Sequence, residues 1–248
     1  MFDFTRQLTL GSALLYAKWR AGGRSGPVTL ALKSGPRFEL RPDSCGNNDY
    51  GVSYEIFVLD YYDDRGRIAA NDVKLIADLG ANVGFSLLYF LHQYPHCRIL
   101  AFEPHPSHYA QARRNLAVDG TAERVELYQV AAGASARAMR LTDRRSSSTL
   151  AEEAGASDTL AVDVADIFPL LEDKRLDILK VDIEGGEYEI LSDPRFEHLD
   201  VGTIVMEWHS RGGGIEDKEW CEQRLCGLGF TIEEIFTQAS HGMFWGWR

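Results

Sequence analysis

The chain is predicted to adopt an α/β fold with a mostly parallel central sheet, crossover helices and an antiparallel terminal strand. Short apolar runs alternate with segments of helical periodicity through its middle, which is typical of parallel strands joined by helices. A glycine-rich turn joins one of these runs to the helix that follows, where a parallel sheet usually binds its ligand. The tail of the chain fits a closing antiparallel pair of strands.

Composition narrows the functional class. The chain has 248 residues, of which 45% are hydrophobic and 25% charged, as in an ordinary globular protein. Its net charge of -11 repels phosphate backbones, so no nucleic-acid partner is expected. No apolar run approaches the ~20 residues that a membrane-spanning helix needs. The cysteines form no C-x-x-C pair, which favours a reduced, cytoplasmic protein.

Residues 1–44 are predicted to form an extension that precedes the main domain at 45–248. Within it, residues 1–20 read as a helix that ends before two glycines. Residues 29–32 and 37–41 alternate apolar and polar side chains around a Ser-Gly-Pro turn, which predicts a hairpin. We expect this extension to shape substrate choice or to support a homo-oligomer.

The main domain is predicted to begin with a loop and a short helix and then to alternate strands with helices. Runs rich in Val, Ile and Leu define the strands, and amphipathic segments between them define the helices. A polar loop at 146–157 separates two of the shorter strands. Strands are predicted at 73–79, 97–102, 124–130, 136–141, 159–164, 176–183, 201–208, 230–235 and 242–247, and helices at 52–62, 84–93, 106–118, 187–191 and 216–228.

The most informative segment is the glycine turn at 78–84, which reads Asp-Leu-Gly-Ala-Asn-Val-Gly. A dinucleotide-binding turn would carry G-x-G-x-x-G, but here Asn82 and Phe85 stand in place of its second and third glycines. The pattern therefore departs from pyrophosphate binding. It suits a ligand with an amino-acid end, whose ammonium group Asp78 can meet.

A second acidic residue follows the glycine turn at the spacing typical of nucleotide-binding folds. Glu103 ends the next predicted strand, about 20 residues past the turn, where an acidic residue typically binds ribose hydroxyls. The alternative interpretation is an ordinary strand–helix turn in which Asn82 caps a helix and Glu103 lies on the surface.

Two later strands also end in acids. Asp182 and Glu184 are predicted to project to the same side of a strand end, where they can hold a substrate, accept a proton or bind a metal. The alternative is that Glu184 or Glu187 caps the following helix. Glu207 and His209 share a side of the next strand. His209 is the best single candidate for a general base, because an imidazole titrates near neutral pH, although a lone histidine is often structural.

These residues resemble the FkbM-type methyltransferase family. The matching segments are residues 78–84, 102–104, 115–116 and 180–185, and the similarity covers about residues 45–210. The resemblance implies a Rossmann-like class I methyltransferase fold with S-adenosyl-L-methionine bound at the carboxyl ends of the central strands. It also implies O-methylation of a hydroxyl on a small molecule, natural product or glycan.

The resemblance also assigns roles to residues of the cofactor site. The glycine turn would surround the methionine part, Glu103 would bind the ribose and Ala131 would lie near the adenine. The expected cofactor-binding residues are Asp78, Gly80, Ala81, Asn82, Gly84, Glu103, Pro104, Ala131 and Asp182.

The expected reaction is an in-line displacement at the sulfonium methyl group, for which acceptor oxygen, methyl carbon and sulfur must be aligned. His209, Asp182 and Glu184 are the candidates for the base. No metal is assigned, although a minority alternative places Mg²⁺ between Asp182 and Glu207. Two rival functions are a nicotinamide-dependent oxidoreductase and a non-catalytic binding or scaffold protein of the same fold.

Overall fold

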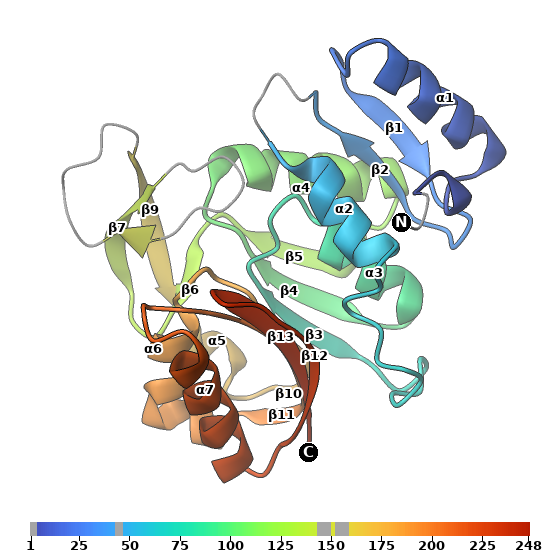
Figure 1. Cartoon of the computed structure of the whole chain (residues 1–248). Coiled ribbons are helices and arrows are strands. Elements are labelled where there is room, and N and C mark those ends of the chain that lie inside the picture. Colours follow the sequence, from blue (N-terminus) through green and yellow to red (C-terminus); the bar gives the residue numbers. More distant parts are fainter. Residues whose placement is uncertain (1–3, 43–46, 143–149, 152–158) are drawn as a thin grey trace.

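A seven-stranded sheet forms the centre of the computed structural model, which describes residues 4–42, 47–142, 150–151 and 159–248 (Figure 1). Its spatial order is β12-β13-β11-β10-β3-β4-β5. The strands are β3 (Leu75–Leu79), β4 (Arg98–Phe102), β5 (Val125–Tyr128), β10 (Arg175–Val181), β11 (Asp200–His209), β12 (Thr231–Thr237) and β13 (His241–Trp247).

The strand directions confirm the predicted sheet. From β5 to β11 every neighbouring pair is parallel, whereas β13 runs antiparallel to both β11 and β12. The antiparallel strand does not lie at the edge of the sheet, because β13 is inserted between β11 and β12. The expected closing pair is therefore present as β12 and β13.

Helices cover both faces of the sheet because buried side chains alternate along each strand. Ile76 and Ile178 pack in one core cluster with α2 (Asp49–Phe57), α3 (Phe85–Gln93) and α4 (Pro106–Asp119). The next residues along the two strands, Ala77 and Leu179, pack in a second cluster on the opposite face. The helices of that face are α5 (Phe168–Leu171), α6 (Glu187–Ser192) and α7 (Ile215–Gly227).

A smaller four-stranded sheet adjoins the central one, in the order β6-β9-β7-β8. Its strands are β6 (Ala131–Gly133), β7 (Arg137–Thr142), β8 (Leu150–Ala151) and β9 (Thr159–Asp166). The strands predicted at 136–141 and 159–164 are thus present and pair with each other. Apart from β8, the polar loop predicted at 146–157 lies outside the described residues.

The N-terminal extension forms a 3₁₀ turn (Phe4–Arg6), helix α1 (Leu10–Ala21) and a hairpin of β1 (Val28–Ala31) and β2 (Arg37–Leu40). The helix begins at Leu10, later than predicted, because the Thr9 side chain caps it by accepting from the Ser12 amide at 3.4 Å. The hairpin is fastened to α4, where the buried Asn115 side chain accepts from the Glu39 amide at 2.8 Å.

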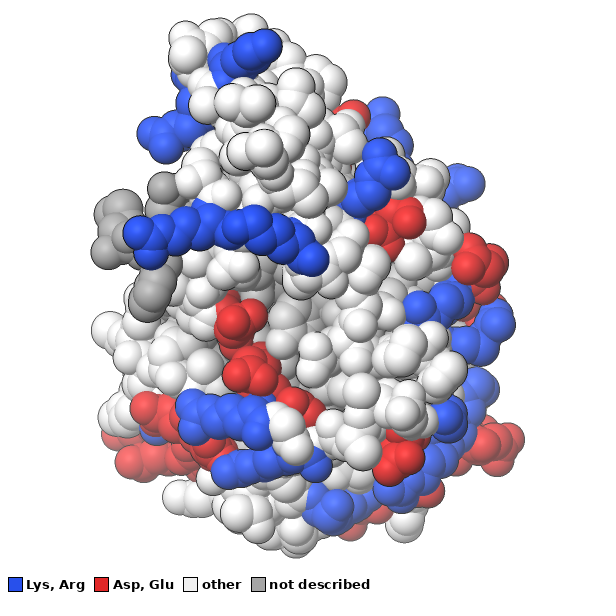
Figure 2. All heavy atoms as spheres, turned by 90° about the vertical axis from the view of Figure 1, so that its right-hand side faces the viewer, with Lys and Arg blue, Asp and Glu red and all other residues white. Residues whose placement is uncertain are grey.

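Two further features concern the charge of the surface and the length of the helices. Figure 2 shows basic and acidic side chains interspersed over the face it presents, rather than gathered into one basic patch. Among the helices of the described residues, none is long and apolar enough to cross a membrane.

Candidate active site

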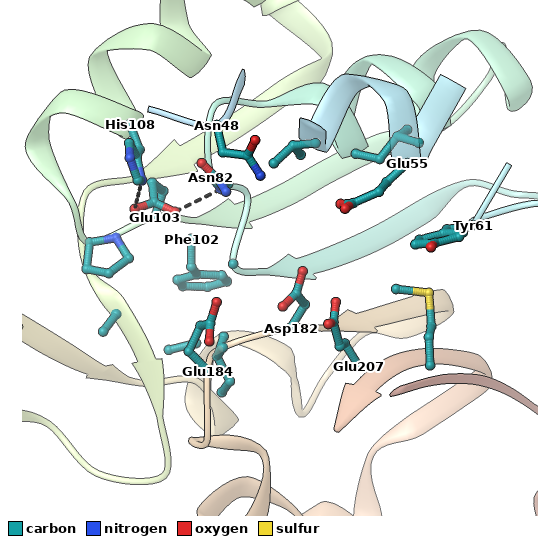
Figure 3. A pocket seen from close by; sticks show the side chains of 18 of the residues that line it. Asn48, Glu55, Tyr61, Asn82, Phe102, Glu103, His108, Asp182, Glu184 and Glu207 are labelled. Atoms are coloured by element: carbon teal, nitrogen blue, oxygen red, sulfur yellow. Dashed lines mark hydrogen bonds and ion pairs between the residues drawn. The ribbon is translucent and has the colours of Figure 1, made fainter. Parts of the chain in front are cut away.

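A cavity of about 210 Å³ lies where β3, β4, β10 and β11 end at their carboxyl sides (Figure 3). Ligands of parallel α/β sheets bind at this edge, so the cavity is the candidate active site. Helix α2 and the chain after it close the cavity from above. The lining residues are Asn48, Val52, Glu55, Ile56, Tyr61, Tyr62, Gly80, Asn82, Phe102, Glu103, Pro104, His108, Ala131, Ala132, Leu141, Asp182, Ile183, Glu184, Glu207 and Met243.

The glycine turn is held tightly between two strand ends. The amides of Gly80 and Ala81 both donate to the Phe102 carbonyl, at 3.1 and 2.9 Å. Gly80 has φ +105°, and a Cβ at that position would lie 1.9 Å from the Asp182 carbonyl oxygen. Only glycine fits there, because both the backbone conformation and the contact exclude a side chain. The close approach places Gly80 and Asn82 at the cavity wall.

Asp78 lies behind the turn instead of in the cavity, contrary to the expectation that it meets the ligand. Its fully buried carboxylate accepts from the Lys180 ammonium at 3.0 Å and from the Ser86 hydroxyl at 2.6 Å. Lys180 also donates to the Gly80 carbonyl at 2.8 Å. Asp78 therefore has an indirect role. It holds the Lys180 ammonium, which in turn holds the glycine turn through the Gly80 carbonyl.

Two other residues expected to bind the cofactor also lie outside the cavity lining. Ala81 is buried, and Gly84 begins α3 with φ +84°, packed against Ala112 of α4. Both residues shape the turn, and neither lines the cavity in which a ligand would bind.

Glu103 follows the end of β4 and faces the cavity, as predicted. Its two carboxylate oxygens accept from the amides of Asn82 and His105, each at 2.8 Å, and His108 Nδ1 lies 3.8 Å away. The residue is only 5% exposed, and this burial raises the pKa of Glu103 to about 7. These bonds fix the orientation of the carboxylate, which excludes a loose surface glutamate. Pro104 and Ala131 line the same end.

Asp182 and Glu184 both line the cavity, but for a different reason than strand alternation. Strand β10 ends at Val181, two residues earlier than predicted, and Glu184 lies in a turn with φ +54°. The turn is anchored where the Asp182 amide donates to the Leu79 carbonyl at 3.0 Å. Burial raises the pKa of Glu184 to about 7.

Glu187 does not act as a helix cap, because its carboxylate is fully buried and turned toward β11. It lies 2.8 Å from His209 Nδ1 and also accepts from the Ile183 amide at 3.3 Å. Burial opposes a charge on His209, but the hydrogen bond and charge of Glu187 outweigh it and raise the pKa of His209 to about 10. His209 is therefore an imidazolium at neutral pH.

The protonated state changes the expected role of His209. It is absent from the cavity lining, and its Nε2 lies 3.5 Å from Glu184 and 3.6 Å from Glu207. An imidazolium donates hydrogen bonds and cannot accept the proton of a substrate. His209 is thus suited to orient the two carboxylates, while Glu207 is better suited as a base.

Glu207 and Glu55 line the end of the cavity opposite Glu103, together with Tyr61 (Figure 3). Burial and the nearby charge of Asp182 raise the pKa of Glu207 to about 8. Burial, with a further contribution from Asp182, also raises the pKa of Glu55. Glu207 was considered from sequence only as a metal ligand. Glu55 and Tyr61 were missed, because they belong to no strand-end motif.

Ligating atoms of Asp182, Glu207 and His209 lie within 4.8 Å of one another, which is the composition of a metal site. Glu187 binds His209 at Nδ1, which leaves Nε2 facing the acids of the cavity. The same arrangement suits an ion pair with these acids and a histidine that is oriented to bind a metal, so the alternative Mg²⁺ site stays a prediction.

Comparison with known proteins agrees with this architecture. The family model described as the methyltransferase FkbM domain matches residues 78–233, well over half of the chain. Methyltransferase sdnD of Sordaria araneosa is 29% identical over 195 residues, which covers 64% of this chain and 74% of that protein. Methyltransferase 1 of Beauveria bassiana is 29% identical over 182 residues, covering 63% and 72%.

Two solved structures share the fold. A methyltransferase FkbM from Methylobacillus flagellatus KT matches with a TM-score of 0.53 and 16% identity, covering 75% of this chain, which spans only 46% of that protein. M. jannaschii TYW2, solved in complex with AdoMet, matches with a TM-score of 0.51 and 11% identity, covering 91% and 86%. The matched region contains the glycine turn, Glu103 and the acids at the carboxyl ends of β10 and β11. The chain belongs to the FkbM-type family of S-adenosylmethionine-dependent methyltransferases.

Proposed function

We propose that this methyltransferase transfers its methyl group to a hydroxyl on a small molecule, natural product or glycan. One observation carries the proposal. The cavity has a rigid, buried acid suited to a ribose at one end, Glu103, and a carboxylate suited to accept a proton at the other, Glu207. Asp182 lies between them (Figure 3). A cofactor and an acceptor can therefore meet over the end of β10.

The residues at the first end fit S-adenosylmethionine. The Glu103 carboxylate is already oriented by two backbone amides, so its remaining acceptor capacity suits a pair of ribose hydroxyls. Gly80 and Asn82 would hold the methionine part, which needs a wall with little side chain. Pro104 and Ala131 offer an apolar surface for the adenine.

The acceptor must be aligned and deprotonated. When bound, the cofactor would supply an electrophilic methyl group on its sulfonium, which would pass to the acceptor oxygen and leave the sulfur as a thioether. Glu207 in its ionised form accepts the hydroxyl proton, because a pKa near 8 makes the carboxylate a stronger base than an ordinary glutamate and leaves it populated at mildly alkaline pH, whereas a pKa near 10 leaves little neutral His209 there. Asp182 and Glu184 are the other candidates, and His209 keeps Glu184 and Glu207 in place by ion pairing.

Calorimetric titration with S-adenosylmethionine and S-adenosylhomocysteine tests the cofactor site. Glu103→Gln should bind both about 10- to 100-fold more weakly, since a hydrogen bond to a charged group contributes ~1.5–3 kcal/mol. Glu123→Gln is the control, because that glutamate is exposed and outside the cavity. No binding by folded wild-type protein, or equal binding by Glu103→Gln, would refute the assignment.

The type of acceptor needs a separate measurement. The protein is incubated with methyl-labelled cofactor and hydroxyl acceptors, and the product is analysed for a methyl ether. Methyl transfer that falls in Glu207→Gln while cofactor affinity is kept supports the proposed base. Methyl recovered on nitrogen or carbon alone would contradict O-methylation.

A further inference from the structure

We infer that the acceptor carries a positively charged amine, held by Glu55, Asp182 and Tyr61 at the end of the cavity away from Glu103. This inference rests on the proposed function, because it concerns the acceptor of the same site. We call this end the acceptor half and define it by Glu55, Tyr61, Asp182 and Glu207.

The first step is the charge of the cavity wall. Five carboxylates line it, and among its described lining residues there is no lysine or arginine. The five are Glu55, Glu103, Asp182, Glu184 and Glu207.

The two buried cations nearby neutralise this charge only in part, because each has a closer partner outside the lining. Lys180 lies 3.0 Å from Asp78 but 3.5 Å from Asp182. His209 lies 2.8 Å from Glu187 but 3.5 Å or more from the acids of the lining. The cavity therefore retains uncompensated negative charge.

The positive charge of the cofactor cannot balance all of the negative charge of the cavity. S-adenosylmethionine carries one net positive charge, and Glu103 lies in the part of the cavity assigned to it, with Asp182 between the two ends. Glu55 and Glu207 lie toward the other end (Figure 3). Both side chains line the cavity, so a cation bound at this end would be attracted by more than one carboxylate.

The same end has an aromatic wall. Tyr61 lines the cavity, and its ring packs against Phe236 with 4.7 Å between ring centroids, so its position is fixed. An aromatic ring beside carboxylates is a favourable environment for an ammonium group. A phosphate, sulfate or carboxylate on the acceptor would be repelled by the same wall. An amino alcohol or amino sugar fits the chemistry, with its hydroxyl toward Glu207.

The alternative source of positive charge is a divalent ion between Asp182, Glu207 and His209. Glu55 and Tyr61 are not part of that metal-binding group, but they do belong to the acceptor half that would hold the amine. Removal of metal and substitution of Glu55 therefore distinguish the two.

The test uses the full chain saturated with S-adenosylhomocysteine, whose binding is measured first in the same sample. Matched sets of small alcohols are then titrated, with each scaffold present in ammonium, neutral and carboxylate forms. The ammonium form of each alcohol should bind at least about tenfold more tightly than its neutral form. One charge-assisted hydrogen bond contributes an affinity difference of this size. Excess EDTA should leave this preference unchanged.

Glu55→Gln should lose the preference by a similar factor while keeping its affinity for S-adenosylhomocysteine. Glu216→Gln, an exposed acid on α7, is the matched control and should behave as wild type. Binding of neutral or anionic members as tightly as ammonium members would overturn the inference. So would a preference that survives in Glu55→Gln, one that disappears in EDTA, or no ammonium binding at millimolar concentration. Failure to bind S-adenosylhomocysteine would refute the proposed function instead.

Discussion

Replacing Lys180 by methionine should be among the most damaging single changes near the site, although the side chain never reaches the cavity. The substitution keeps the side-chain volume and leaves the Asp78 carboxylate buried without its cation. Breaking a buried ion pair in this way costs ~3–5 kcal/mol of unfolding free energy. For a chain of this size a loss of ~1 kcal/mol lowers the melting temperature by about 2–4 °C, so a fall of roughly 6–20 °C is expected.

The assay is urea and thermal unfolding followed by circular dichroism, with S-adenosylhomocysteine affinity as a second readout. That affinity should fall as well, because Lys180 donates to the Gly80 carbonyl and holds the turn. The double variant Lys180→Met with Asp78→Asn should recover much of the stability, since no unpaired charge remains. Lys174→Met, at an exposed position, is the control and should stay within ~0.5 kcal/mol of wild type. The reasoning is wrong if Lys180→Met loses less than about 1 kcal/mol, or if the two substitutions simply add.

Two further predictions concern pH. The raised pKa of His209 stabilises the fold through its pairing with Glu187, fully below the unfolded pKa of ~6.5, and this contribution is lost as pH rises toward about 10. The difference in melting temperature between wild type and His209→Gln should therefore shrink across that range, and a constant difference would contradict the assignment. Glu207 lowers stability in the same direction with pH, because its raised pKa makes ionisation unfavourable in the folded state as pH rises from ~4.3 through about 8. Glu207→Gln should therefore gain stability relative to wild type over that interval, and thermal scans that show no gain would refute the burial argument.

The parts of the site that could be predicted from sequence lie in short motifs at strand ends. Glu103 and Asp182 follow runs of apolar residues that form parallel strands, and topology alone brings such positions to one edge of the sheet. Gly80 could be identified because a turn with little side chain between a strand and a helix is typical of a ligand-binding loop, and the structure adds that a Cβ there would collide with the Asp182 carbonyl. The mostly parallel sheet and the closing antiparallel pair followed from the same alternation of elements, whereas the strand order did not.

The remaining features depend on contacts between distant segments. Asp78 is next to the turn in sequence, but β3 continues to Leu79, so its side chain points into the interior toward a lysine 102 residues away. The charge of His209 is set by Glu187, which reads as a helix-capping residue when only its local sequence is considered. Glu55 comes from a helix that tertiary packing places over the cavity, and nothing in its neighbourhood marks it as functional.

The insertion of β13 between β11 and β12 has a consequence for synthesis on the ribosome. Strand β12 is made first, yet its only partner in the described sheet is β13, so it has nowhere to pair until residues 241–247 emerge. Until then β11 exposes an open edge, to which another chain can add. Met243 is also the cross-strand partner of Glu207. The end of the cavity that contains Glu207 is therefore completed only after β13 is made, and a translation product that stops before β13 is expected to be inactive and prone to association.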